Sequence, residues 1–234
     1  RSKARVLLIG EKLAEYGIFP TLDSMYRDPL GPLNASVAIV EKTAKEGLEI
    51  KEDQSFLKSS FYFDLLKSAE DNGVIKRGNV QSVCPVLLSG RKDITLPLIK
   101  VGEKQNAYIK GLALFSSDQM TGSLDEDESI MALILLNEIK HKLQMNLKIT
   151  DAHKEFEKNF VTFSVLKEKR KLTVSEKDER ILANFHINLQ LEVEEFAQDH
   201  LYNEGKVQEL ENKIEKSLQE LANKTIAKTQ QANS

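Results

Sequence analysis

The stretch that decides most of the fold is Ile181-Leu182-Ala183-Asn184-Phe185-His186-Ile187-Asn188-Leu189-Gln190-Leu191-Glu192-Val193. Every odd position is apolar, and the even positions are mostly polar. A period of two predicts a long strand of an antiparallel sheet, with one buried face and one face towards water. His186 falls on the wet face without another histidine at ligand spacing, so we expect it to be a surface residue.

The segments around this strand also have β or hairpin character. Alternation indicates further strands over residues 145–149 and 160–166. A strand over 108–115, a turn over 116–119 and a short return over 120–122 predict a hairpin. The second half of the chain is therefore expected to contain a mostly antiparallel sheet.

Two helices are expected to cover that sheet. Ser123-Leu124-Asp125-Glu126 matches a capping box, which predicts a helix running to about His141. The acidic run 125–128 fits the positive helix end better than a metal site, because it lacks the spacing of a calcium loop. A second helix is expected over 205–230, with the pairs Glu209–Lys213 and Glu220–Lys224 on its solvated side and a frayed end after it.

The first half of the chain mixes short helices and strands. We expect a strand over 5–10 and a helix over 11–16, then an irregular stretch to about residue 32 and a strand over 35–40. An amphipathic helix follows over 56–72. The segments 83–88 and 94–101 are β-prone, and their prolines suit edge or irregular strands. Cys84, in the first of these, is expected to be a small buried hydrophobic residue.

The composition changes at the polar bridge 102–106, where we place a domain boundary. The predicted fold class is α+β with two or more domains, over residues 1–106 and 107–234. In the second domain, a mostly antiparallel sheet is packed by long helices.

Overall composition excludes several classes of protein. The 234 residues include 33 Lys and Arg against 36 Asp and Glu, which argues against the basic surface that nucleic-acid binding requires. The apolar run 130–136 is far shorter than the roughly 20 residues that cross a bilayer. One cysteine cannot form an internal disulfide. Because the chain begins at Arg1, we expect a processed product whose targeting segment precedes it.

Known catalytic motifs are missing from the sequence. We find no nucleophile elbow, zinc-protease, nucleotide-loop or Cys-x-x-Cys pattern. No catalytic, cofactor-binding or metal-ligating residue is therefore predicted, and Gly10, Gly111 and Gly122 are assigned to strand ends and turns.

Two stretches resemble a known family. The first runs from Val6 to Ile18 and is followed by Leu22-Asp23 and Arg27-Asp28-Pro29. The second comprises Gly111 to Phe115, then Asp118, Thr121 to Leu124 and Glu126 to Glu128, with the Leu-Pro segment 96–99 between the two stretches. In order and spacing they are similar to the Ger(x)C family, the lipoprotein C subunits of nutrient germinant receptors in bacterial spores.

This resemblance implies a non-enzymatic subunit without a cofactor, required for nutrient-triggered germination and acting by protein–protein interaction. Its implied partners are two integral-membrane subunits of the same receptor. It implies a lipid anchor upstream of Arg1 that holds the chain at the outer surface of the inner spore membrane; Cys84 is not the anchor residue. The germinant stays unidentified, as does whether this subunit binds it.

Two alternatives stay open. One is an extracytoplasmic cell-wall hydrolase that uses dispersed carboxylates such as Glu168 or Glu194. The other is a module that binds the nutrient itself.

Overall fold

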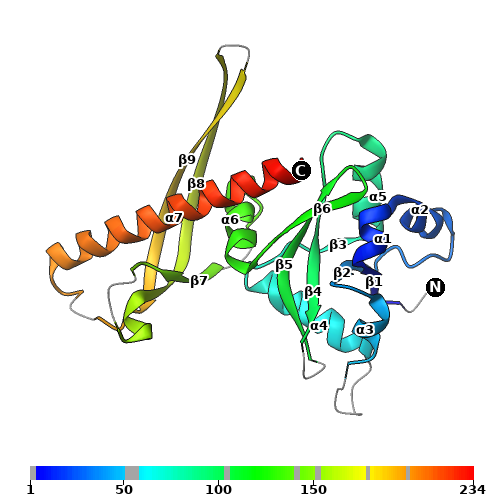
Figure 1. Ribbon diagram of the computed structural model, residues 1–234, viewed down its shortest axis with the longest axis horizontal. Coiled ribbons are helices and arrows are strands. Elements are labelled where there is room, and N and C mark those ends of the chain that lie inside the picture. The colour runs from blue at the N-terminus through cyan, green and yellow to red at the C-terminus, as the bar shows by residue number, and fades with distance from the viewer. Residues whose placement is uncertain are drawn as a thin grey trace.

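The computed structural model describes residues 4–50, 58–102, 106–139, 143–150, 154–177, 180–198 and 201–234. Its strands form two sheets, and helices pack against them (Figure 1). This arrangement confirms the predicted α+β class with two domains. The predicted start of the helix over 56–72 lies outside the described residues. The helix predicted to run to about His141 is shorter than expected: it ends at Leu136, because Asn137 adopts a left-handed conformation and caps it.

The larger sheet is mixed. Its strands are β1 (Val6–Gly10), β2 (Ser36–Val40), β3 (Gly78–Asn79), β4 (Thr95–Val101), β5 (Ala107–Ser116) and β6 (Gln119–Leu124). Its main order is β1-β2-β4-β5-β6, with β3 beside β2; β1, β2 and β4 are parallel, while β5 and β6 continue antiparallel. The 102–106 bridge therefore connects paired strands of one sheet, and a division at residue 106 stays a prediction.

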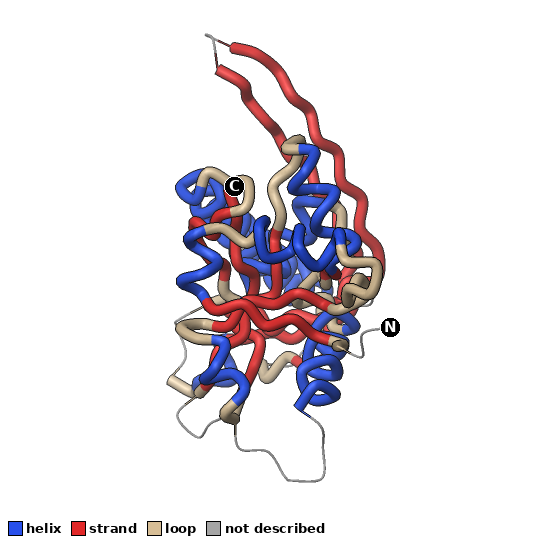
Figure 2. Tube along the Cα trace, turned by 90° about the vertical axis from the view of Figure 1, so that its right-hand side faces the viewer, coloured by secondary structure: helices blue, strands red, loops and turns tan. Residues whose placement is uncertain are grey.

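Helices cover both faces of this sheet (Figure 2). One core contains α1 (Glu11–Tyr16), α2 (Phe19–Arg27) and α5 (Val80–Ser89). The other contains α4 (Lys58–Asp71) and α6 (Glu126–Leu136) and continues into the smaller sheet. A short helix α3 (Ala44–Leu48) follows β2.

Two helical segments were not expected. The prediction of a strand over 83–88 is wrong, because this segment is part of the helix α5. The helix begins where Asn79 and Ser82 form a reciprocal capping box. Cys84 is nevertheless fully buried, as predicted, and burial, together with the charge of Asp23, raises the pKa of its thiol. The stretch expected to be irregular contains α2, which begins at Phe19 with Pro20 in its first turn.

The smaller sheet is antiparallel and consists of β7 (Leu143–Lys148), β8 (Phe160–Lys177) and β9 (Arg180–Glu195), with a 3-10 turn η1 (Phe156–Asn159) before β8. β7 pairs with β8 only up to Val165. Beyond that residue β8 and β9 continue as a two-stranded hairpin that projects from the body of the molecule (Figure 1).

The last helix, α7 (Glu204–Ala232), packs beside α6 and the strands β5, β6 and β7. Its packing on a sheet confirms the prediction, and Leu210 and Ile214 are buried in the larger core. The expectation of a frayed end is wrong: the helix continues to Ala232, whose side chain is buried against Leu114, Leu124 and Ala132.

Candidate functional site

A cleft of about 580 Å³ lies where the first half of the chain meets the hairpin and the end of α7. Residues 76–95 form one wall, and the end of α6 contributes Leu135 and Leu136. The opposite wall combines the middle of the hairpin with residues 225–234. Clefts of this volume are large enough for a small molecule or for side chains of a partner protein.

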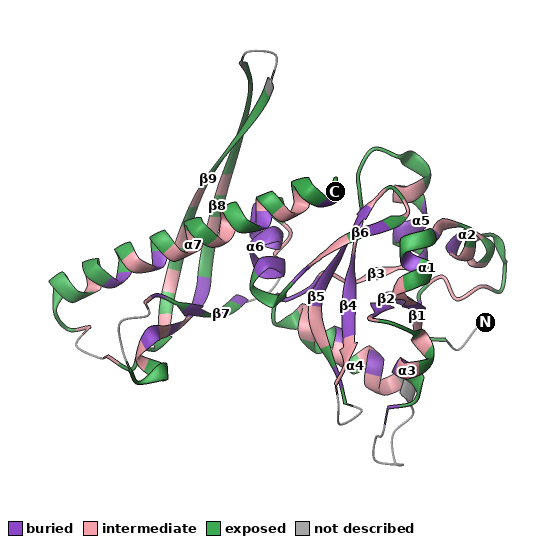
Figure 3. Cartoon of the chain, in the orientation of Figure 1, coloured by how far each residue is buried: buried purple, intermediate pink, exposed green. Residues whose placement is uncertain are grey.

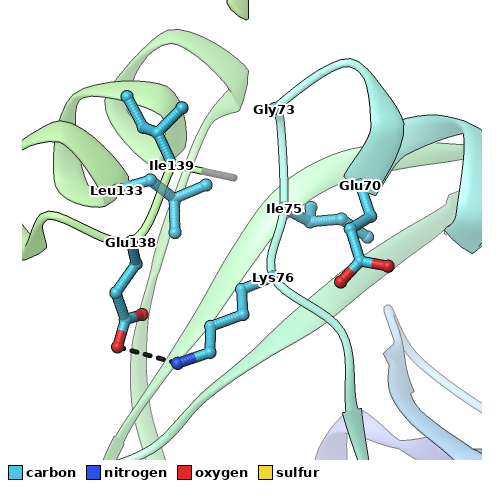
Figure 4. A pocket seen from close by; sticks show the side chains of 7 residues that line it. All are labelled: Glu70, Gly73, Ile75, Lys76, Leu133, Glu138 and Ile139. Atoms are coloured by element: carbon cyan, nitrogen blue, oxygen red, sulfur yellow. Dashed lines mark hydrogen bonds and ion pairs between the residues drawn. The ribbon is translucent and has the colours of Figure 1, made fainter. Parts of the chain in front are cut away.

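The first wall carries a shared ion pair. Lys76 and Lys92 place their Nζ atoms 2.7 Å and 2.9 Å from the same Oε1 of Glu138. Burial raises the pKa of Glu138, but hydrogen bonds from the two lysines outweigh it and hold the pKa below its ordinary value. Figure 4 shows Lys76 and Glu138 pointing towards each other beside a small pocket of about 10 Å³, which is only large enough for a water molecule.

Positive charge exceeds negative charge around the cleft. Four cationic side chains line it, from Lys76, Arg77, Lys92 and Arg170, against two carboxylates, from Asp93 and Glu138. Arg77 is neutralised by Glu70, with 2.6 Å between Nε and Oε2. Lys76 and Lys92 are balanced by Glu138 and Asp93, so this wall has no excess charge, and the remaining positive charge of the cleft is that of Arg170 on the hairpin.

Arg170 stands on the hairpin side of the cleft. Its guanidinium donates a hydrogen bond to the carbonyl of Leu135 and lies 5.7 Å from the ring centroid of Phe185. Within the described part of the chain no carboxylate forms an ion pair with it, although Glu168 on the same strand is near enough for Arg170 to lower the pKa of that carboxyl. Arginine has five donors, so Arg170 can bind a further acceptor from the cleft.

A buried hydroxyl also faces the cleft. Thr225 of α7 is 1% exposed, and its Oγ1 has no hydrogen-bond partner among the described residues. A buried hydroxyl without a partner costs roughly 1–3 kcal/mol. An acceptor or donor that entered the cleft could remove that cost.

One face of the hairpin continues the apolar surface of the cleft. The strand register pairs Leu172 with Phe185 and Val174 with Ala183, and these residues share a face with Ile181. We call the set Leu172, Val174, Ile181, Ala183 and Phe185 the hairpin apolar face. Val174 and Ile181 are 59% and 79% exposed (Figure 3). The predicted buried face of this strand is therefore wrong towards the tip, because the body of the molecule ends before the hairpin does.

Closer to the body, the same face is covered. Ile187, Leu189, Leu191 and Val193 are partly buried and pack against the larger core. His186 is exposed on the opposite face, as predicted.

A buried carboxylate fixes α7, one of the cleft's walls. Glu128, at the start of α6, is 0% exposed. The Nζ atoms of Lys224 and Lys228, both from α7, lie 2.9 Å and 2.6 Å from its carboxylate oxygens. The predicted capping box is shifted by two residues: Asp125 is the N-cap, and Glu128 accepts from its backbone N–H at 2.9 Å. The predicted pair Glu209–Lys213 is confirmed at 2.7 Å, whereas Lys224 pairs with Glu128 instead of Glu220.

The two carboxylates considered for a hydrolase are not brought together as a pair. Glu194 accepts a hydrogen bond from Ser164 at 2.6 Å, whereas Glu168 lies opposite Leu189. Ser164 and Glu168 are four residues apart along β8, a separation of roughly 13 Å. Burial raises the pKa of Glu168, with Arg170 acting in the opposite direction. In the described residues, no three His, Cys, Asp or Glu side chains form a group that could hold a metal ion.

Sequence reasoning missed the residues that make this cleft. Arg170 and Leu172 lie in the segment 167–177, whose many charges hide a strand. The alternation of Leu172, Thr173 and Val174, followed by the strand at 181, was the available signal.

Comparison with known families covers both halves of the chain. Residues 1–101 match the family model described as "Spore germination protein N-terminal domain". Residues 110–234 match "Spore germination B3/GerAC like, C-terminal". The chain belongs to the Ger(x)C family. The resemblance found in the sequence is thereby confirmed.

The Ger(x)C fold has a solved counterpart. The structure described as "Crystal Structure of the GerBC protein" matches with a TM-score of 0.68 and 16% sequence identity. The match covers 94% of this chain and 62% of the GerBC chain, so the present chain corresponds to less than two thirds of that protein. At this identity the likeness establishes the fold. A comparison with curated proteins gives no match. Among the described residues no helix is long and apolar enough to cross a membrane.

Proposed function

We propose that this Ger(x)C chain is a non-enzymatic subunit of a nutrient germinant receptor and works by binding the receptor's two integral-membrane subunits. The observation that carries this proposal is the family match over both halves of the chain. A lipid attached upstream of Arg1 would hold it at the outer surface of the inner spore membrane. Such an anchor gives membrane affinity without an apolar helix in the folded part.

The geometry supports association as the mode of action. An exposed apolar surface at the end of a projecting hairpin is typical of a protein–protein contact. The positively charged cleft adjoining it can add specificity for one partner.

A deletion experiment in spores tests the proposal. Spores that lack other receptors for the same nutrient should lose their response when this gene is deleted, while nutrient-independent germination continues. Complementation with the complete gene should restore the response. An unchanged nutrient response in the deletion strain would contradict the proposal.

Direct nutrient capture is a second candidate, favoured by the size of the cleft and its excess of positive charge. Calorimetry of the purified chain with amino acids, sugars and nucleosides tests this candidate. Saturable binding that is lost in Arg170→Gln would favour capture, and absence of heat for all three classes would contradict it.

A further inference from the structure

The hairpin apolar face and the adjoining cleft form one surface. Arg170, Leu172 and Phe185 line the cleft, and Val174 and Ile181 extend the same face towards the tip. Successive residues on one strand face are roughly 6.6 Å apart. The apolar surface therefore runs well beyond the cleft, farther than a nutrient-sized molecule needs.

The two faces of the hairpin differ sharply in chemistry. The face opposite the apolar one carries Lys169, Lys171 and His186, all exposed. The hairpin apolar face also carries Glu176 opposite Ile181, but its other side chains are mostly large and apolar and are in contact with water, an arrangement that costs free energy until something covers them. Solvation alone gives no reason for this asymmetry, whereas a partner on one side does.

Charge identifies the kind of partner that fits. Arg170 forms no ion pair with a described carboxylate, although Glu168, two residues before it on β8, interacts with it electrostatically. At the other wall Lys76 and Lys92 are balanced by Glu138 and Asp93. Complementary carboxylates on a partner would satisfy Arg170 and balance the excess positive charge. An anionic partner that also carries apolar side chains would fit both features.

We propose that the hairpin apolar face and the adjoining cleft bind a segment of a receptor membrane subunit in which apolar residues are flanked by carboxylates. This inference rests on the proposed function and assigns the contact surface for it. The bound segment bridges residues 76–95 and the hairpin, which line opposite walls of the cleft.

Two leucines on the hairpin provide a matched test. Leu172 and Leu182 are each 42% exposed, but the register places them on opposite faces of the same hairpin. Leu172→Asp changes the apolar face, and Leu182→Asp makes the same chemical change on the other face. Equal exposure gives the two variants similar effects on folding, which thermal unfolding of each purified variant verifies.

The experiment co-expresses the complete lipoprotein with its two membrane subunits and measures how much of them is retained on the tagged lipoprotein in detergent. We expect Leu172→Asp to reduce retention about tenfold or more, as for a central contact residue. Leu182→Asp should retain the wild-type amount. A second pair tests charge: Arg170→Gln should weaken retention, and Lys171→Gln should not.

The outcomes separate the two proposals. If the wild-type lipoprotein retains neither membrane subunit, the proposed function fails and this inference fails with it. If wild type retains them and Leu172→Asp matches Leu182→Asp, the function stands and the assigned surface is wrong. An equal loss of membrane-subunit retention in Leu172→Asp and Leu182→Asp would also overturn the inference that the contact is confined to one face.

Other occupants are distinguished with the same variants. Self-association of the complete lipoprotein in detergent that Leu172→Asp abolishes would assign the face to a second copy. Binding of the unlipidated chain to vesicles of phosphatidylglycerol that Leu172→Asp abolishes would assign it to lipid. Loss of calorimetric nutrient binding in the same variant would assign it to a small molecule. Each result, found with unchanged retention of the membrane subunits, overturns the inference.

Discussion

At the scale of single residues, Glu128 is the main electrostatic connection between α7 and the rest of the molecule. It is fully buried, and it accepts from Lys224 and Lys228 as well as from the backbone of Asp125. Removing Glu128 deletes its hydrogen bonds with both lysines and with the Asp125 backbone, whereas Lys224 and Lys228, whose side chains are 58% and 39% exposed, stay solvated. This site therefore determines how firmly α7 holds its side of the cleft.

We expect Glu128→Ala to lower the free energy of unfolding by about 3 kcal/mol. Urea denaturation at neutral pH measures this change. Glu126→Ala, an exposed substitution in the same helix turn, should cost less than about 1 kcal/mol. Similar values for the two variants would show that the contacts of Glu128 add little to stability.

The same carboxylate predicts a dependence of stability on pH. Burial raises the pKa of Glu128, but hydrogen bonds from Lys228, the Asp125 backbone and Lys224 outweigh it, so the pKa lies below the ordinary value of 4.5. A lowered folded-state pKa stabilises the protein above the unfolded value, and this contribution is lost as pH falls through the folded value. The stability difference between wild type and Glu128→Gln should therefore shrink as pH falls below 4.5. Urea curves at a series of pH values test this; a constant difference would contradict it.

Two glycines allow a matched test of close packing. Gly111 has a φ of 145°, and a Cβ there would lie 2.2 Å from the carbonyl oxygen of Leu124. Gly90 has a φ of 56° with open space around it. Gly90→Ala should cost about 1 kcal/mol from backbone strain alone. Gly111→Ala should lower the free energy of unfolding, measured by chemical denaturation, clearly more than Gly90→Ala does. Equal losses in the two variants would contradict the close approach of β5 and β6.

At the scale of elements, prediction from sequence succeeded where a regular pattern agreed with tertiary packing. The strands β1, β2 and β5 and the helix α7 follow their patterns closely. The failure at α5 arose because Val83 and Pro85 are typical of edge strands, while the Asn79–Ser82 cap and a fully buried Cys84 favour a helix in this context. The cleft could not be predicted, since its walls come from residues more than 140 positions apart, such as Lys76 and Thr225.

The projecting hairpin is expected to be separable from folding. Residues 173–176 and 181–184 are exposed on both faces, so replacing residues 173–184 by Asn-Gly removes little of the buried surface that the structure describes. We expect the midpoint of thermal unfolding to change by no more than about 4 °C. Circular dichroism during heating measures it, and unfolding of the shortened chain at room temperature would show that the tip is part of the core.

At the scale of the whole molecule, the proposed function depends on the protein's exterior. Its two cores pack around the larger sheet and the base of the smaller one. One surface left uncovered is the hairpin apolar face, which adjoins the cleft that contains Arg170. The proposed function, action by association with other receptor subunits, would require such a surface.

This whole-molecule view predicts the phenotype of a surface variant. Spores that carry the full-length protein with Leu172→Asp as their only copy should germinate with nutrient much as the deletion strain does. Spores with Leu182→Asp should respond as wild type. Immunoblots of spore membranes confirm equal amounts of both variants; an equal nutrient response of the two strains would contradict the assigned surface.

Photo-crosslinking in intact spores tests the central claim most directly. A photoreactive amino acid is placed at position 172 in one strain and at position 182 in another, and the crosslinked products are identified by mass spectrometry. We predict that position 172 crosslinks to an integral-membrane subunit of the receptor and that position 182 does not. Absence of a membrane-subunit product at position 172, with the lipoprotein present in normal amount, would contradict the account.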